Sequence, residues 1–142
     1  MLAETGCDVV MAGRALAARP WMLWQIGETW QWPEPGQAEE LGLGVWDVDL
    51  QKRRAPQSSE EEGAEYGKCL LRLIFYCRHY FREDLALRKI RFYVRTTSVW
   101  LLFGHSLISV TTKAKNLDEL EQGVRVFFSN PVEMTQRTEL RE

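Results

Sequence analysis

The chain has 142 residues, of which 45% are hydrophobic, and a formal net charge of −2. This length suffices for one domain with a core, but a whole (β/α)8 barrel takes roughly 200 residues or more. Neither a run of about 18 apolar residues nor a basic segment followed by an apolar one is present, so we expect a cytoplasmic protein without a membrane span. The cysteines Cys7, Cys69 and Cys77 lack metal-ligand spacing, which indicates free thiols and no metal.

The first pattern is an apolar run, Val9 to Ala12, followed directly by Gly13 and Arg14. Such a run without polar alternation is typical of a strand covered on both faces in a parallel sheet. A glycine at the carboxyl end of the strand lets a phosphate approach the backbone, and the arginine supplies charge. The same pattern also fits a plain strand end with a surface arginine. Pro20 then begins a short apolar helix, which is predicted to end near Gly27.

Residues 33–58 are acidic and rich in proline and glycine, and they are interpreted as a linker or insertion. Apolar spacing then predicts four helices within residues 59–130, which form a bundle, so the fold class is mainly α. Residues 131–142 are expected to be a flexible tail. The first helix is expected at roughly 60 to 82, with Ser59 and Glu62 as a capping box at its start. The second is expected at about 84 to 102 and the third around Leu107 to Ala114. The fourth is expected to begin at Asn116, which caps it with Glu119 three residues later, and to end just before Pro131.

Positive charge is concentrated in residues 67–115, which hold ten basic and two acidic side chains. Arg88, Arg91 and Arg95 are spaced i, i+3 and i+7, so on an ideal helix they form one stripe. With Lys89 they are the candidate RNA-binding residues. The alternative is an ordinary solvated helix face. Helices stabilised by surface salt bridges carry both acidic and basic side chains, whereas these helices have few acidic ones. This favours a surface that binds a polyanion.

Two segments resemble one family. The run ETGCDVVMAGRALAARPWMLWQI resembles the last barrel strand and following helix of the tRNA-dihydrouridine synthases, and LALRKIRFYVRTTSVWLLFGHSLISVTTKAKNLDELEQGV is similar to their carboxy-terminal helical domain. The resemblance implies that residues 1–32 are the end of a TIM barrel and that residues 59–130 bind tRNA. It further implies that Gly13 and Arg14 hold the FMN phosphate. In the intact enzyme reduced FMN converts uridine in tRNA to dihydrouridine, and NADPH re-reduces the flavin.

The catalytic cysteine of that family lies in a mid-barrel context like Asn-x-Gly-Cys-Pro, which this sequence does not contain. No catalytic residue is therefore assigned, and the chain alone is expected to be inactive. The missing part of the barrel is the expected partner, and without it the chain is expected to bind no flavin. Trp21 and Trp24 are expected to pack on that barrel. Two alternatives stay open, a stand-alone helical RNA-binding module that is not an enzyme, and an inactive truncated remnant.

Overall fold

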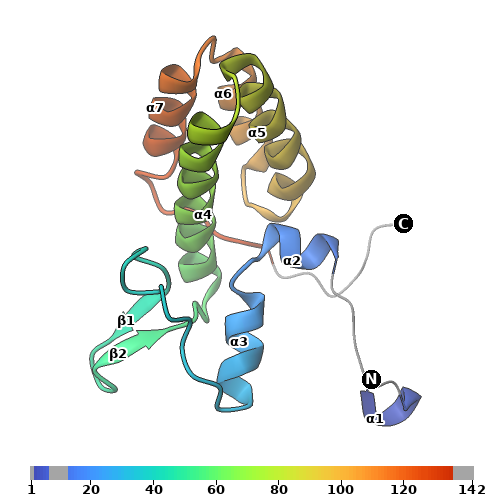
Figure 1. Cartoon of the computed structure of the whole chain (residues 1–142), viewed down its shortest axis with the longest axis vertical. Helices are drawn as coiled ribbons and strands as arrows, with labels where there is room; N and C mark the ends of the chain where they lie inside the picture. The colour runs from blue at the N-terminus through green and yellow to red at the C-terminus, as the bar shows by residue number, and fades with distance from the viewer. Residues whose placement is uncertain (1, 7–12, 136–142) are drawn as a thin grey trace.

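Figure 1 shows the computed structural model, which describes residues 2–6 and 13–135. The chain is mainly helical, as the apolar spacing predicts, with one small sheet. The elements are α1 (Leu2–Thr5), α2 (Arg14–Ala18), α3 (Met22–Thr29), β1 (Val45–Asp47), β2 (Lys52–Arg54), α4 (Ser59–Tyr80), α5 (Glu83–Thr97), the 3-10 turn η1 (Ser98–Trp100), α6 (Gly104–Lys113) and α7 (Leu117–Phe127).

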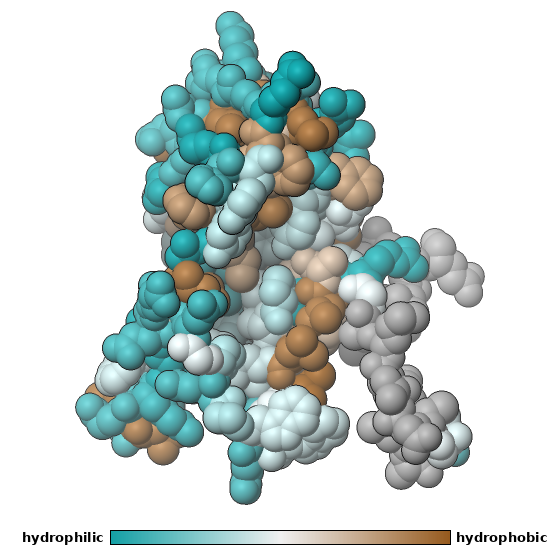
Figure 2. All heavy atoms as spheres, in the orientation of Figure 1, coloured by the Kyte–Doolittle hydropathy of each residue, from teal (hydrophilic) through white to brown (hydrophobic). Residues whose placement is uncertain are grey.

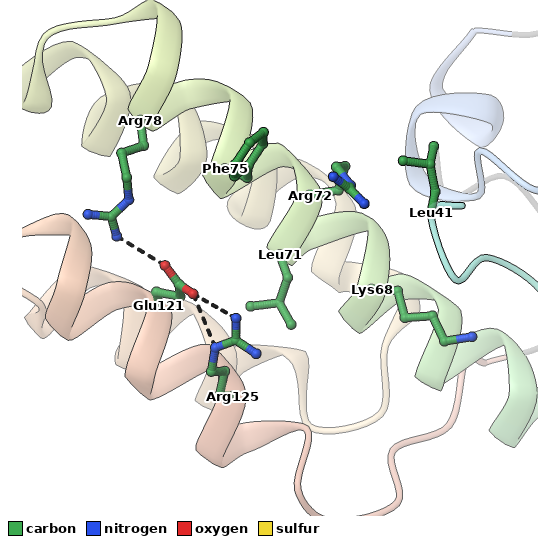
Figure 3. A pocket seen from close by; sticks show the side chains of 8 residues that line it. All are labelled: Leu41, Lys68, Leu71, Arg72, Phe75, Arg78, Glu121 and Arg125. Carbon is green, nitrogen blue, oxygen red and sulfur yellow. Dashed lines mark hydrogen bonds and ion pairs between the residues drawn. The ribbon is translucent and has the colours of Figure 1, made fainter. Parts of the chain in front are cut away.

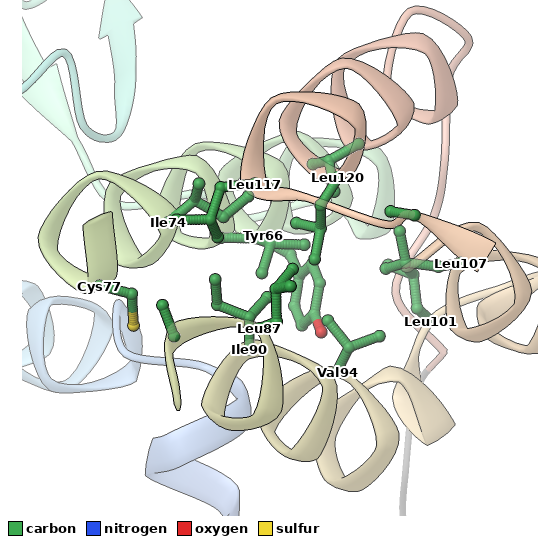
Figure 4. Close-up of a cluster of buried hydrophobic side chains, with 14 of the residues drawn as sticks. Tyr66, Ile74, Cys77, Leu87, Ile90, Val94, Leu101, Leu107, Leu117 and Leu120 are labelled. Atoms are coloured by element: carbon green, nitrogen blue, oxygen red, sulfur yellow. The ribbon is translucent and has the colours of Figure 1, made fainter. Parts of the chain in front are cut away.

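Helices α4 to α7 form the predicted bundle, in which α4 packs against α5 and α7, and α6 packs against the same two helices from the other side (Figure 1). The core contains the apolar residues that the helical spacing predicts. Tyr66 lies at its centre, where its hydroxyl group is 2.7 Å from that of Thr97, so this buried polar group is satisfied. Figure 4 shows the surrounding side chains, which include Ile74, Leu87, Ile90, Val94, Leu107, Leu117 and Leu120.

The beginning of α4 differs by one residue from the prediction. Ser58, and not Ser59, accepts a hydrogen bond from the backbone N–H of Glu61, and the Glu61 carboxylate accepts one from the N–H of Ser58. The predicted capping box of Ser59 and Glu62 is therefore wrong in register. Glu62 instead accepts a hydrogen bond from the Trp21 indole at 3.2 Å, because it faces α3.

Of the other helix ends, the start of α7 agrees with the prediction and the end of α5 does not. Asn116 caps α7 by accepting a hydrogen bond from the backbone N–H of Glu119, as predicted. Helix α5 ends earlier than expected, at Thr97, because the chain turns through η1 and Phe103, whose φ is 60°. Gly104 begins α6, where a Cβ would overlap the carbonyl oxygen of Ser98.

The amino-terminal elements pack on the bundle. Helix α2 contacts α5, where the Tyr93 hydroxyl donates a hydrogen bond to the Ala17 carbonyl oxygen at 2.9 Å. The helix predicted from Pro20 is α3. The strand expected at residues 9–12 falls outside the described residues.

Both tryptophans that were expected to contact a barrel are buried within this chain. Trp21 belongs to the bundle core, and Trp24 packs with Ala38 and Ala55. The expectation that they pack on a barrel is therefore wrong, since both side chains are already buried against other residues of this chain. The opposite face of α3 is exposed.

Residues 33–58 form a folded excursion and not an open linker. Strands β1 and β2 pair antiparallel, with Val45 opposite Arg54. The hairpin is fixed to α4, because the backbone N–H of Gly44 donates to the buried Glu65 carboxylate at 2.8 Å and Arg54 binds Glu61 at 2.8 Å.

The chain after α7 also departs from the prediction. Residues 131–135 run across the base of α4, where the N–H of Met134 donates to the Ser59 carbonyl oxygen at 2.9 Å. Val132 and Met134 are buried, so this stretch is held by apolar packing as well as by hydrogen bonds. The expected flexible tail is wrong for these residues, and residues 136–142 lie outside the described part of the chain.

Candidate nucleic-acid interface

Gly13 and Arg14, the predicted phosphate-binding pair, stand at the start of α2. Both residues are exposed, and no described atom lies within 4 Å of the position that a Cβ on Gly13 would take. The Gly13 carbonyl oxygen accepts the first hydrogen bond of α2 from the Ala17 N–H at 3.1 Å. The backbone at Gly13 and the guanidinium of Arg14 are thus both accessible to an anion.

The predicted stripe on α5 divides into exposed and engaged residues. Arg88 and Arg95 are exposed and form no ion pair with any residue that the structure describes. Arg91 is half-buried, and its guanidinium donates to the carbonyl oxygens of Thr111 at 3.1 Å and Ala114 at 2.7 Å. These oxygens belong to the end of α6, where the last turn leaves acceptors without helical partners. Arg91 therefore departs from the prediction of an open stripe, because α6 packs against its edge of α5.

The Arg91 contact brings two further cations to this side of the bundle. Lys113 and Lys115 flank Ala114, and both are exposed without an ion pair to a described residue. Two carboxylates at this end of the bundle bind backbone N–H groups, Glu119 that of Lys115 at 2.8 Å and Glu83 that of Leu117 at 3.0 Å. We call the exposed cations Arg88, Arg95, Lys113 and Lys115 the α5/α6 basic face.

Lys89, the fourth candidate, lies on another side of α5. Its ammonium group is 4.8 Å from the centroid of the Phe81 ring. Together with Arg88 it borders a groove of about 510 Å³ between α4 and α5. We call this the α4/α5 groove, and its other lining residues are Leu73, Cys77, Phe81, Leu85, Phe92 and Tyr93.

A second groove, between α4 and α7, was not predicted from the sequence. Figure 3 shows Arg78 and Arg125 converging on Glu121, at 3.0 and 2.7 Å. The hydrogen bond from Arg125, followed by that from Arg78, lowers the pKa of the Glu121 carboxyl. The Arg72 guanidinium lies over the Phe75 ring, 5.7 Å from its centroid. The signal that could have found this groove is the pair Glu121 and Arg125 at helical i, i+4 spacing.

The expectation that the basic helices lack acidic partners is wrong for α4. Arg78 binds Asp118 at 2.7 Å as well as Glu121, and Lys68 binds Glu65 at 3.0 Å. The acids of α7 lie just beyond the basic segment in the sequence, and the fold brings them back to α4. Among the described residues, α5 and the end of α6 hold five cations without an ion pair, which are Arg88, Lys89, Arg95, Lys113 and Lys115.

Two of the three cysteines belong to the described residues, and both are at least partly buried. Burial raises the pKa of the Cys69 thiol to about 12 and also raises that of Cys77, so both stay protonated at neutral pH and are poor nucleophiles. Cys7 lies outside the described residues. Within residues 2–6 and 13–135, no three His, Cys, Asp or Glu side chains lie together in a way that could hold a metal ion.

Two features thus characterise the described part of the chain, an accessible basic face and an apolar groove with cations at its rim. Such a surface suits a polyanion that also carries flat apolar groups. None of the helices in residues 2–6 and 13–135 combines the length and apolar character needed to cross a membrane. Comparisons with models of known protein families, with curated proteins and with solved structures found no match.

Proposed function

We propose that this chain is the carboxy-terminal part of a tRNA-dihydrouridine synthase, whose helical bundle binds tRNA and whose α2 and α3 adjoin the FMN-binding barrel. The observation that carries the proposal is the α5/α6 basic face, where exposed cations from two helices lack acidic partners among the described residues. Arginine and lysine contacts to phosphates position an RNA on a protein and make binding depend on salt.

The exposed side of α3 supports the barrel part of the proposal. Leu23, Ile26 and Trp30 are spaced i, i+3 and i+7, and they are 54%, 38% and 54% exposed. Figure 2 shows a hydrophobic strip on the surface over α3. A contiguous apolar face in water is unfavourable, and it commonly marks a contact with another protein surface. A barrel wall would cover this face.

Gly13 and Arg14 would hold the FMN phosphate in the intact enzyme. The open space beside Gly13 and the exposed guanidinium of Arg14 fit a phosphate group. Reduced FMN would supply the hydride that converts uridine to dihydrouridine, and NADPH would restore the reduced flavin. The described residues would contribute binding and positioning, while the acid that protonates the base would come from the barrel.

Binding of unfractionated tRNA to the full chain, measured by fluorescence anisotropy between about 50 and 200 mM salt, tests the RNA-binding part. Affinity is expected to fall steeply with salt. The double variant R88A/R95A is expected to bind more weakly, with a logarithmic salt slope smaller by about 2. Lys52→Ala, an exposed cation on the distant hairpin, serves as the control. Salt-insensitive binding, or a double variant that binds like the control, would contradict the proposal.

The coding sequence upstream of Met1 tests the synthase part. An in-frame barrel that contains an Asn-x-Gly-Cys-Pro motif is expected there. Unrelated upstream sequence would remove the synthase proposal and would leave RNA binding to be judged on its own.

A stand-alone RNA-binding module is the second candidate, and the closed core favours it. Trp21 and Met134, from the two ends of the described chain, both complete the bundle core. The visible absorption of the purified chain tests an expectation that both candidates share, which is that this chain alone binds no flavin. A yellow preparation with stoichiometric flavin would contradict a module without cofactor, and it would also overturn the expectation that the barrel is needed to bind FMN.

A further inference from the structure

We propose that the α4/α5 groove holds one unpaired nucleobase of a bound RNA, stacked against Phe92, with the neighbouring phosphates on Arg88 and Lys89. The inference rests on the proposed RNA binding and adds to it a specific site for a single-stranded nucleotide. A paired base cannot enter such a groove without leaving its helix, so the site distinguishes loops from duplexes.

The shape and lining of the groove suit a flat apolar ligand. Its volume of about 510 Å³ opens between two packed helices, and its lining is predominantly apolar. Leu73 and Cys77 belong to the wall that α4 provides, and Cys77 is also part of the bundle core. Phe92 and Phe81, which both line the groove, are 69% and 40% exposed. The groove therefore offers aromatic surface that no described residue covers fully.

The cations at the rim indicate which apolar ligand the groove binds. Arg88 and Lys89 both line it, and neither forms an ion pair with a described residue. A purely aliphatic ligand would gain nothing from them, whereas a nucleotide combines an aromatic base with an anionic phosphate. Lys89 already lies over the Phe81 ring, and Phe92 is the more exposed of the two rings, so we assign the stacking contact to Phe92.

The groove has few polar atoms with which to read the identity of a base. Besides the charged groups of Arg88 and Lys89 at its rim, its lining includes Tyr93, whose hydroxyl donates its hydrogen bond to the carbonyl oxygen of Ala17. Recognition would therefore rely on stacking, which accepts any base. The site is expected to prefer unpaired RNA without a strong sequence preference.

Binding of the full chain to two RNA probes tests the inference. One probe is oligouridine of about twelve nucleotides, and the other is an RNA duplex of about the same length. Phe92→Ala is expected to weaken oligouridine binding roughly tenfold and to leave duplex binding nearly unchanged, because only the single strand stacks on the ring. The salt slope is expected to stay the same, since no phosphate contact is removed. Phe92→Trp, which keeps an aromatic face, is expected to restore binding.

Phe75→Ala is the matched control, because Phe75 is a phenylalanine that is 56% exposed and lies in the groove between α4 and α7. Circular dichroism should show that both alanine variants keep the native fold. If the chain binds tRNA but F92A binds oligouridine like F75A or like the wild type, the groove does not hold a base, and the proposed function stands. If loss is equal on both probes, Phe92 does not act by stacking. If neither probe nor tRNA binds, both proposals fail.

Discussion

The Arg91 guanidinium lies 2.7 Å from the carbonyl oxygen of Ala114, and this contact joins the middle of α5 to the end of α6. A second hydrogen bond reaches the Thr111 carbonyl oxygen at 3.1 Å. A cation at a helix carboxyl terminus satisfies free acceptors and interacts favourably with the helix dipole. Arg91 thus supports α6, which contains the β-branched residues Val110 and Thr112 and has low intrinsic helix propensity.

Removing this contact is expected to destabilise the chain more than removing a neighbouring arginine. Arg91→Ala leaves partly buried carbonyl oxygens without a donor, so the free energy of unfolding should fall by about 2 kcal/mol. Arg95→Ala changes an exposed residue and should alter it by less than about 0.5 kcal/mol. Urea denaturation of the two variants provides the measurement. Equal stabilities would show that Arg91 is not a structural residue.

The helices of the bundle could be predicted because their signals are local. Apolar residues at helical spacing identified α4 to α7, and Asn116 with Glu119 marked the start of α7. The start of α4 was less clear, since Ser58 and Ser59 are each followed three residues later by a glutamate. Glu62 instead contacts Trp21 and Gln25, which are far from it in the sequence, and such contacts cannot be predicted from local spacing.

The features that the sequence did not predict depend on distant contacts. The β1–β2 hairpin is held by the buried Glu65, whose position on a helix face gave no sign of a backbone partner at Gly44. The engaged state of Arg91 depends on where α6 packs, and helical spacing alone could place Arg91 only on a stripe with its neighbours. In the candidate interface, Arg88 and Arg95 were predicted from helical spacing. That Lys113 lies near them, and that Lys89 borders a groove, could be seen only in the folded structure.

Stability at acidic pH is expected to depend on Glu61. The side-chain hydrogen bond from Arg54, helped by backbone N–H groups of Gln57 and Ser58, lowers the Glu61 pKa from its ordinary value of 4.5 to about 2. A carboxyl whose pKa is lower in the folded state stabilises the fold above its unfolded pKa, and this contribution is lost as the pH falls from 4.5 toward 2. Glu61→Gln should therefore cost about 2 kcal/mol near neutral pH and almost nothing near pH 2.

Glu60→Gln is the matched control for this experiment, because Glu60 lies in the same helical turn but is exposed. Its free energy of unfolding, measured in urea across the same pH range, should follow that of the wild type. A difference between E61Q and wild type that does not shrink toward low pH would show that the charge of Glu61 is not what stabilises the fold.

Docking of residues 131–135 against α4 can be tested at Gly63. A Cβ at this position would overlap the Val132 carbonyl oxygen, so Gly63→Ala should displace the segment and lower the free energy of unfolding by roughly 1–3 kcal/mol. Gly36→Ala is the control, since no described atom lies within 4 Å of its Cβ position. Hydrogen exchange should detect faster exchange at Met134 in G63A, because its N–H bond to Ser59 would open. Unchanged protection at Met134 would contradict this packing.

The two faces of α3 are expected to respond differently to substitution. Leu23→Glu with Ile26→Glu changes the exposed face and should leave the free energy of unfolding within about 1 kcal/mol of the wild type. Trp24→Ala removes a buried side chain and should lower it by roughly 3–5 kcal/mol.

The exposed face is also expected to cause reversible self-association of the chain when no barrel covers it. Sedimentation velocity should show that the wild type associates and that its association increases with concentration. The L23E/I26E variant should stay monomeric, because burying two carboxylates in an apolar contact has a large desolvation cost. Val48→Glu, which alters an exposed apolar residue of the loop between β1 and β2, is the control and should associate like the wild type. A wild type that stays monomeric at every concentration, or equal association of both variants, would show that this face of α3 is not a contact surface.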